Sequence, residues 1–420
     1  MIALGTLLLK LPFATTDSIT WMDALFTATS SFTVTGLAIV DIGTSFTHFG
    51  QLIILLLIKL GGIGIVTFAI LAFMMLGKKI GMKERIMIQQ TLNQESLGGI
   101  LKLVRRIFIH SLTIELVATL ILALRWVPRY GMSTGLYYSF FHAVSAFNNA
   151  GISLFSNGLD VYMIDPIVSL VMTTLFIMGG IGFTVLIDLK DKKKFSRLSL
   201  HSKVMIIGTL VLNVVAMLLF LVLETSNPET LGAMHAVDDQ ILAAYFQATT
   251  ARTAGFSTVS ISGFRTPTVI FMSILMFIGS GSASTAGGIK LTTFIVVVLS
   301  TLTFIRGKKE VTIGHRTLRE RVIIRAFTIL TLSFLFIVLS LFILTITESI
   351  PTAHLFFEIM SAFSTVGLSM GVTAELSFVG RCLMMILMFF GKIGPLTLAF
   401  SLANPTPEKI RYPNEDLLTG

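Results

Sequence analysis

Four short segments of the chain place glycine at one common register. The segments align without gaps and are Ala24–Leu37, Ser139–Ile152, Ala243–Phe256 and Leu355–Leu368. Their shared glycines are Gly36, Gly151, Gly255 and Gly367. Six positions before each glycine stands a hydroxyl residue, and these are Ser30, Ser145, Thr249 and Ser361. Self-similarity of this kind indicates a structural unit that is repeated along the chain.

The residues next to these glycines could bind a bare cation through their backbone. Converging carbonyl oxygens can replace the hydration shell of an ion, and glycine adopts at least cost the dihedrals that aim successive carbonyls to one side. None of the four loops carries a carboxylate, so backbone dipoles and not a ring of charges would hold the ion. The residues predicted to supply carbonyls are Val34, Thr35, Gly36, Asn149, Ala150, Gly151, Thr253, Ala254, Gly255, Thr365, Val366 and Gly367. The competing interpretation, small residues that pack membrane helices together, does not explain four loops at one register.

The composition places these loops in a membrane. The chain is 54% hydrophobic and only 13% charged, whereas soluble domains carry about 25% charged residues. Its apolar blocks reach the roughly 20 residues that span a bilayer. The net charge is +9, and the basic residues lie in short loops between these blocks. Their position indicates how the protein is oriented in the lipid bilayer and does not indicate binding to nucleic acid.

The elements around each glycine predict a repeat of helix, half-helix with loop, and helix. Each aligned segment has about 12 residues up to its glycine. That length is too short to span the bilayer but suits a re-entrant helix. Apolar runs follow the four loops, at Gln51–Leu76, Ile167–Leu189, Thr268–Ile305 and Val379–Leu402. Others precede three of them, at Leu101–Val127, Val204–Leu223 and Val322–Thr347. Only Met1–Leu11 precedes the first, either because the start is trimmed or because that helix is short.

The predicted fold class is an all-α polytopic membrane protein with four pseudo-symmetric repeats around a central pore. The repeats are assigned to residues 1–77, 78–189, 190–305 and 306–402, followed by a cytoplasmic tail at 403–420. Basic residues gather in 78–106, 190–203 and 306–325, which predicts that these linkers are cytoplasmic. All four half-helices then enter from outside, a parallel arrangement unlike the inverted repeats of many transporters.

The third apolar run contains a second unusual segment. Thr268–Ile305 is nearly twice as long as one span needs. Its middle is Gly279, Ser280, Gly281, Ser282, Ala283, Ser284, Thr285, Ala286, Gly287 and Gly288. Glycine and serine are poor helix formers, so we predict a broken helix whose polar loop lies under the glycine loops. A glycine-rich packing face is the alternative. The shorter stretches Gly61–Gly64, Gly179–Gly182 and Gly391–Gly394 are expected only to bend or pack closely.

Four basic residues lie at membrane depth, where charges are functional candidates by default. Lys392 is the strongest candidate. Its positive charge beneath a cation-binding loop would raise the barrier to ion passage unless it is paired with an acid or bonded to loop carbonyls. Lys290 and Lys59 could snorkel or bond exposed carbonyls instead. Arg252 is expected to turn behind the third loop and pair with an acid, Glu358 or Asp239.

With these motifs the chain resembles the Trk/Ktr/HKT superfamily of potassium transporters, and within it the bacterial Ktr branch. The resemblance covers essentially the whole chain. It is carried by Thr253-Ala254-Gly255-Phe256, Gly287-Gly288-Ile289-Lys290 and Gly391-Lys392-Ile393-Gly394-Pro395. All four loops carry glycine, as in the potassium-selecting members, whereas some sodium-conducting plant relatives have serine in the first.

The resemblance implies a potassium-conducting homodimer in the bacterial cell membrane, with one pore per subunit. It implies that Gly279–Gly288 is a gating loop, with Lys290 and Lys392 beside it, and that K⁺ binds at the loop carbonyls, with Na⁺ as a candidate activator. It also implies a cytoplasmic ring of RCK-domain subunits that bind ATP, ADP or NAD. The chain has no GxGxxG or Walker loop of its own, so nucleotide control must come from that partner.

Two other functions compete. A sodium- or ammonium-conducting relative would share these motifs, because a carbonyl site does not announce its ion in sequence. An intramembrane serine hydrolase would use Ser282 or Ser284 with His110, His142 or His354. The chain lacks GxSxG and HExxH, and hydrolysis leaves the fourfold repeat unexplained. We therefore expect a transporter and not an enzyme.

Overall fold

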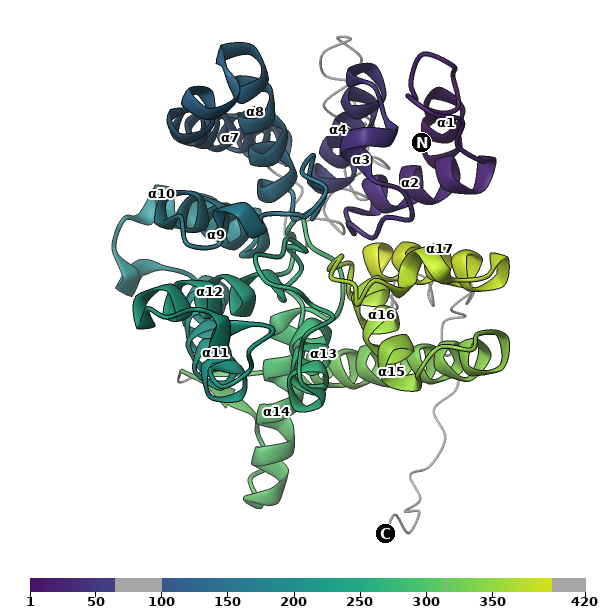
Figure 1. The fold of residues 1–420 in the computed structure, drawn as a ribbon. Helices are drawn as coiled ribbons and strands as arrows, with labels where there is room; N and C mark the ends of the chain where they lie inside the picture. Colours follow the sequence, from purple (N-terminus) through teal and green to yellow (C-terminus); the bar gives the residue numbers. More distant parts are fainter. Residues whose placement is uncertain (65–99, 315, 395–420) are drawn as a thin grey trace.

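The computed structural model describes residues 1–64, 100–314 and 316–394. Its helices stand in four groups around a central axis (Figure 1). The first two groups contain α1 (Ile2–Leu9), α2 (Trp21–Thr33), α3 (Ile42–Ser45) and α4 (His48–Ile63), then α7 (Ile100–Tyr130), α8 (Met132–Phe147), η1 (Asp160–Tyr162), α9 (Pro166–Gly180), α10 (Phe183–Lys192) and η2 (Phe195–Arg197). The last two contain α11 (Leu200–Glu224), η3 (Leu231–Ala233), α12 (Val237–Thr250), α13 (Thr266–Phe277) and α14 (Leu291–Ile305), then α15 (Glu320–Thr347), α16 (Thr352–Ser364), η4 (Val372–Glu375) and α17 (Phe378–Ile393).

Three of the described helices, α7, α11 and α15, are long and apolar enough to cross a membrane. The pair α9 and α10 would make a fourth span if counted together, although it bends by 97° at its break. Large apolar side chains on these helices point outward, for example Leu210 at 65% exposed and Phe334 at 61%. Such a surface suits lipid and not water. The prediction of a polytopic all-α membrane protein is confirmed. The one sheet among the described residues is a hairpin of two strands with two residues each, β1 (Thr312–Ile313) and β2 (Arg316–Thr317).

The four half-helices are present as predicted. They are α2, α8, α12 and α16, of 13 to 16 residues each. Helix α2 starts at a capping box, in which the Thr20 hydroxyl accepts from the Asp23 N–H and the Asp23 carboxylate from the Thr20 N–H. This cap fixes where the first half-helix begins. The buried ends of all four then approach the central axis (Figure 1).

Glycines bend or end the helices that follow the loops, as expected. Helices α4, α9 and α17 stop just before Gly64, Gly182 and Gly394, whose φ angles are +89°, +106° and +90°. One turn earlier, a Cβ on Gly61, Gly179 or Gly391 would overlap the carbonyl oxygen of Phe32, Phe147 or Phe363, respectively. Each of these helices therefore packs with its backbone against the end of its own half-helix, a close approach that only glycine permits.

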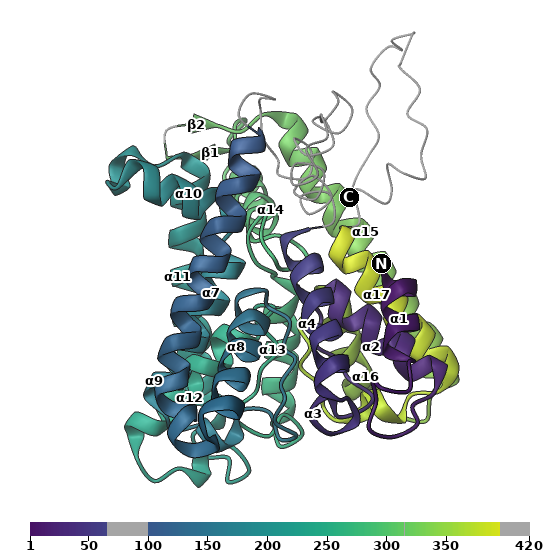
Figure 2. The ribbon, with the colours of Figure 1, turned by 90° about the horizontal axis from the view of Figure 1, so that it is seen from above.

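The two ends of the molecule differ in charge as the linkers predict. In Figure 2, α10 and the β1–β2 hairpin lie at one end, whereas α3 and α12 lie toward the other. The first end carries the basic linkers 190–203 and 306–325. The repeat boundaries remain predictions, and the ends of two apolar runs (65–76 and 395–402), most of linker 78–106 and the tail 403–420 lie outside the described residues.

Candidate functional site

The four glycine loops meet in a closed ring. A Cβ on Gly36 would touch the Ala150 carbonyl oxygen at 2.5 Å, and one on Gly151 would touch the Cα of Gly255 at 2.9 Å. A Cβ on Gly255 would overlap the Val366 carbonyl oxygen, and one on Gly367 would overlap that of Thr35. Each loop therefore contacts the next, and the fourth contacts the first. We call Gly36, Gly151, Gly255 and Gly367 the glycine ring.

Left-handed backbone recurs at two positions in each loop. The ring glycines have φ angles of +94°, +64°, +77° and +94°. Two residues before each of them a non-glycine residue is also left-handed: Val34 at +58°, Asn149 at +56°, Thr253 at +79° and Thr365 at +51°. Non-glycine residues adopt this conformation only at a cost of about 1–3 kcal/mol. The alternation of left-handed residues with ordinary ones is the geometry that turns successive carbonyls to the same side.

The side chains of the predicted carbonyl residues are buried. Val34, Asn149, Thr253 and Val366 are no more than 1% exposed, and the ring glycines are only partly buried. That the carbonyls of these loops line an opening for a cation stays a prediction from the sequence.

Hydroxyl groups hold three loops at the predicted register. The Ser30 and Ser361 hydroxyls accept from the backbone N–H groups of Gly36 and Gly367 at 3.1 and 3.0 Å. The Ser145 hydroxyl donates to the Ile152 carbonyl at 2.8 Å. In the third loop the Thr249 hydroxyl donates to the Tyr245 carbonyl of its own helix. The hydroxyl of its neighbour Thr250 donates to the Phe256 carbonyl instead. Helix α12 ends at Thr250, five residues before its glycine, so the anchor there is displaced by one residue.

The third apolar run is broken, as predicted, between Phe277 and Leu291. We call Gly279–Gly288 the intramembrane loop. Its Gly281 N–H donates to the Gly180 carbonyl at 2.7 Å. Its Gly287 N–H donates to the Thr365 hydroxyl at 3.0 Å, and its Gly288 N–H to the Gly391 carbonyl at 3.2 Å. The intramembrane loop is thus tied to the α9–α10 bend, to the fourth glycine loop and to α17.

Two lysines donate to carbonyls of the intramembrane loop. Lys392 Nζ lies 2.5 Å from the Thr285 carbonyl oxygen, and Lys290 Nζ lies 2.6 Å from that of Ala286. In the part of the chain that the structure describes, neither lysine is within 4.0 Å of a carboxylate oxygen. Of the alternatives left open by the sequence, the structure shows carbonyl bonding for both lysines.

Lys59 has a partner that sequence reasoning missed. Its Nζ lies 2.5 Å from Glu115 Oε1 on α7, and the Glu115 side chain is only 1% exposed. A signal was available, because Glu115 is the single acidic residue in the apolar run Leu101–Val127. An acid at membrane depth calls for a basic partner, and Lys59 is the one that the fold brings to it.

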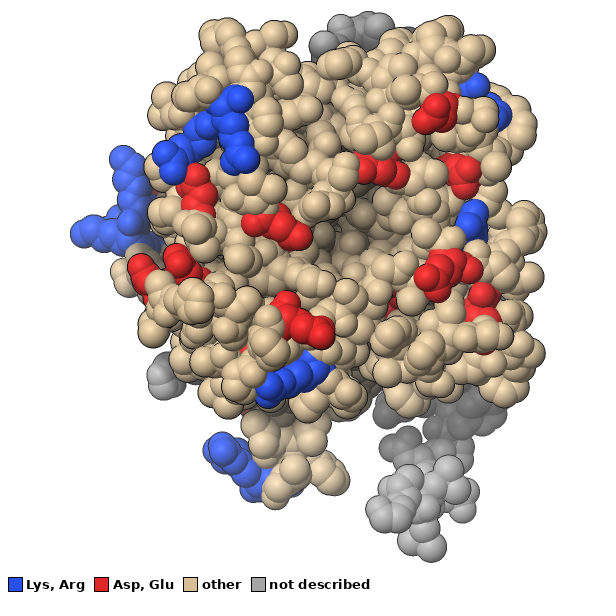
Figure 3. Space-filling model, in the orientation of Figure 1, with Lys and Arg blue, Asp and Glu red and all other residues tan. Residues whose placement is uncertain are grey.

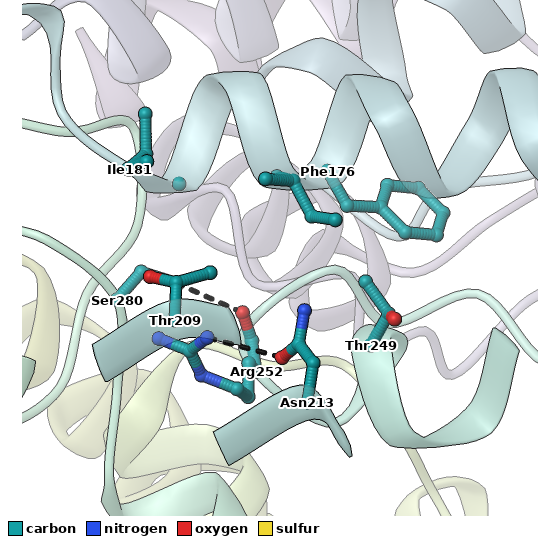
Figure 4. A pocket seen from close by; sticks show the side chains of 9 residues that line it. Phe176, Ile181, Thr209, Asn213, Thr249, Arg252 and Ser280 are labelled. Carbon is teal, nitrogen blue, oxygen red and sulfur yellow. Dashed lines mark hydrogen bonds between the residues drawn. The ribbon is translucent and has the colours of Figure 1, made fainter. Parts of the chain in front are cut away.

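Arg252 turns behind the third loop, but its predicted acid partners are wrong. The guanidinium is 6% exposed and donates from Nη1 to Asn213 Oδ1 on α11 at 3.1 Å (Figure 4). Glu358 instead accepts from the Ser369 and Thr373 hydroxyls and the Met370 N–H, and no Arg252 ion pair occurs among the described residues. The backbone carbonyl of Arg252 accepts from Ser280 at 3.0 Å, which joins the third loop to the intramembrane loop (Figure 4).

Known proteins match this chain in both sequence and structure. A family model described as TrkH, cation transport protein, matches residues 3–412. The Ktr system potassium uptake protein B of Bacillus subtilis is 53% identical over 419 residues, which cover 100% of this chain and 94% of that protein. The potassium/sodium uptake protein NtpJ of Enterococcus hirae is 34% identical over 429 residues, covering 100% and 95%. The solved structure of the potassium transporter TrkH from Vibrio parahaemolyticus matches with a TM-score of 0.74 at 17% identity, covering 92% of this chain and 79% of that one.

The structural match confirms the fold of four helix–loop–helix repeats, and the sequence matches confirm the resemblance to the Trk/Ktr transporters. The protein is accordingly a multi-pass transporter of the bacterial cell membrane and not an enzyme. The chain belongs to the TrkH family of cation transport proteins.

Proposed function

We propose that this chain is the membrane subunit of a potassium uptake system, and that K⁺ crosses the membrane through the glycine ring. The observation that carries the proposal is the closed circuit of four left-handed loops, each within contact distance of the next. Carbonyls of the twelve residues predicted from the sequence, from Val34 to Gly367, coordinate the dehydrated ion.

Two further features support a cation as the transported species. The four half-helices end at the ring, and helix C-termini carry about half a negative charge. On the face seen in Figure 3, acidic side chains surround a central hollow. Negative potential at such an entrance raises the local concentration of cations.

The intramembrane loop acts as the gate. Its residues, from Gly279 to Gly288, lie against the third and fourth glycine loops through Ser280 and Gly287. Lys290 and Lys392 hold it there by donating to its carbonyls. Withdrawal of the loop would open the path, which is a population shift between two arrangements of one segment.

Control of this gate comes from a cytoplasmic ring of RCK-domain subunits that bind ATP, ADP or NAD, on a homodimer of this chain. Lys193, Lys194 and Arg197 of the second linker and Lys308 and Arg319 of the third are exposed. An acidic or polar partner surface could cover them.

Na⁺ is the second candidate, either as an activator or as a transported ion. The name of the NtpJ relative, a potassium/sodium uptake protein, favours keeping it. One experiment separates the candidates: expression of this chain, with and without an RCK partner, in a strain deficient in potassium uptake. Growth at low external K⁺, with K⁺ and Na⁺ fluxes measured in the same cells, supports the proposal. Na⁺ flux without K⁺ flux refutes it.

A further inference from the structure

A polar network lies behind the second glycine loop and crosses from the first repeat to the second. Lys59 Nζ on α4 is 2.5 Å from both Glu115 Oε1 and Ser111 Oγ on α7. Asn148, which precedes the left-handed Asn149, donates from Nδ2 to the same Glu115 oxygen at 3.0 Å. One buried carboxylate oxygen thus accepts from the ammonium of Lys59, whose side chain is 19% exposed, and from the side chain of a glycine-loop residue.

Stability alone does not account for this network. Burying an ion pair costs desolvation that its attraction barely repays, and apolar residues of similar size are often as stable or more so. What an apolar pair could not supply is an acceptor for Asn148. The acceptor here is the Glu115 carboxylate, and a buried carboxylate needs a cation such as Lys59 beside it.

Asn148 is well placed to transmit the position of Glu115 to the ring. Its Nδ2 also donates to the Val144 carbonyl at 2.8 Å, and a Cβ on Gly62 of α4 would overlap its Oδ1. The side chain is therefore enclosed by α4, α7 and its own half-helix. Two residues later comes Ala150, whose carbonyl oxygen lies against Gly36 of the first loop.

The third loop uses the same position in the same way. Arg252 stands three residues before Gly255, as Asn148 stands before Gly151, and it too bonds the preceding membrane helix, at Asn213. In the first loop the corresponding residue, Thr33, bonds within its own loop, to Thr35 at 2.8 Å. Anchoring of this position to an outer helix therefore occurs in two of the four loops.

We propose that Glu115, held by Lys59, is a positioning residue that fixes Asn148 and through it the carbonyls of the second glycine loop. The inference rests on the proposed function, because it concerns the ion preference of the ring. It assigns to the Glu115 side chain, as the acceptor for Asn148, a role in selectivity that is separate from the role of its ion pair with Lys59 in holding helices together.

Two double variants separate these roles, because both remove the ion pair and only one keeps the acceptor. Lys59→Met/Glu115→Gln leaves an amide oxygen for Asn148, whereas Lys59→Met/Glu115→Leu leaves none. In proteoliposomes the first should keep the wild-type K⁺ half-saturation and K⁺-over-Na⁺ preference. The second should raise the K⁺ half-saturation about 3- to 10-fold, the worth of one hydrogen bond. Thermal unfolding should show the first to be as stable as wild type, since it leaves no buried charge unpaired, and the second to be slightly less stable, because the buried Asn148 amide loses an acceptor.

Arg106→Met/Asp191→Asn is the matched control, because it removes another ion pair of α7, at 3.1 Å, whose side chains are 55% and 53% exposed. It should change neither flux nor stability. Asn148→Ala tests the same contact from the loop side and should raise the K⁺ half-saturation as Lys59→Met/Glu115→Leu does. It keeps the test available if that double variant does not fold. Equal K⁺ half-saturation in both double variants, or a wild-type value in Asn148→Ala, would overturn the inference. Wild-type protein that carries Na⁺ but no K⁺ would instead overturn the proposed function.

Discussion

Serine in place of Gly255 should impair K⁺ transport more than serine in place of Gly151, although both glycines belong to the ring. Their φ angles are +77° and +64°, so both substitutions meet a backbone penalty of about 1–3 kcal/mol. The space around them differs. A Cβ on Gly255 would overlap the Val366 carbonyl oxygen, whereas the atom nearest a Cβ on Gly151 is the Cα of Gly255 at 2.9 Å.

The overlap at Gly255 falls on an oxygen that is proposed to face the ion. Relief of the clash must move the Val366 carbonyl, since the loops on both sides are buried. If about 1–3 kcal/mol of strain is transferred to ion binding, K⁺ affinity falls about 5- to 150-fold, because 1.4 kcal/mol is a factor of ten. At Gly151 the nearest atom, at 2.9 Å, is farther away than the overlapping oxygen at Gly255, so the backbone must shift less and the loss should be smaller.

Gly131→Ser is the control for backbone strain, since Gly131 has a φ of +82° with no atom within 4 Å of a Cβ. The assay is K⁺ and Na⁺ uptake into proteoliposomes at graded concentrations, with protein folding checked by size-exclusion chromatography. The expected order of K⁺ half-saturation is Gly255→Ser above Gly151→Ser, with Gly131→Ser equal to wild type. An unchanged value for Gly255→Ser, or a larger effect at Gly151 than at Gly255, would refute the reasoning.

Three other predictions concern Lys392, the basic linkers and Ser30. Lys392→Met removes a charge-assisted hydrogen bond worth about 1.5–3 kcal/mol; basal flux without the partner should rise at least tenfold, and unchanged flux would mean that Lys392 does not hold the gate. Neutralising the basic residues of 190–203 and 306–325 should weaken co-purification of an RCK partner, most at low salt, because exposed charges are screened within about 8–10 Å at physiological ionic strength; salt-independent binding would contradict this. Ser30→Ala removes the acceptor of the Gly36 N–H and should lower K⁺-over-Na⁺ preference about 2- to 10-fold, whereas an unchanged ion preference would show that this bond does not shape the ring.

The sequence predicted best those features that depend on backbone chemistry. The glycine register predicted four loops, because helix packing does not require glycine at one position of four repeats. The run of glycine and serine after Phe277 predicted a broken helix, because both residue types are poor helix formers. The bends at Gly64, Gly182 and Gly394 follow from the same property.

Side-chain partners were predicted less well, because pairing depends on how the helices pack. Arg252 was expected to pair with an acid, since a buried guanidinium without one is costly. The fold instead offers the amide of Asn213. The end of α12 at Thr250 is nearby, and its C-terminal dipole favours a cation. The pairing of Lys59 with Glu115 joins residues of two repeats, and the spacing within one repeat does not indicate it.

If the intramembrane loop is the gate and the glycine ring selects the ion, as proposed, the contacts between them imply that gating and ion selection are not independent. The Gly287 N–H bonds the Thr365 hydroxyl, and the Ser280 hydroxyl lies 3.0 Å from that of Thr253. Thr365 and Thr253 are the left-handed residues of the fourth and third glycine loops. Displacement of the intramembrane loop would break both bonds at positions where the backbone is already strained. The carbonyls of these two loops would then relax, so the open state should bind K⁺ with a different affinity from the closed one. Linkage requires the converse as well: K⁺ bound in the ring must shift the position of the gate by the same factor.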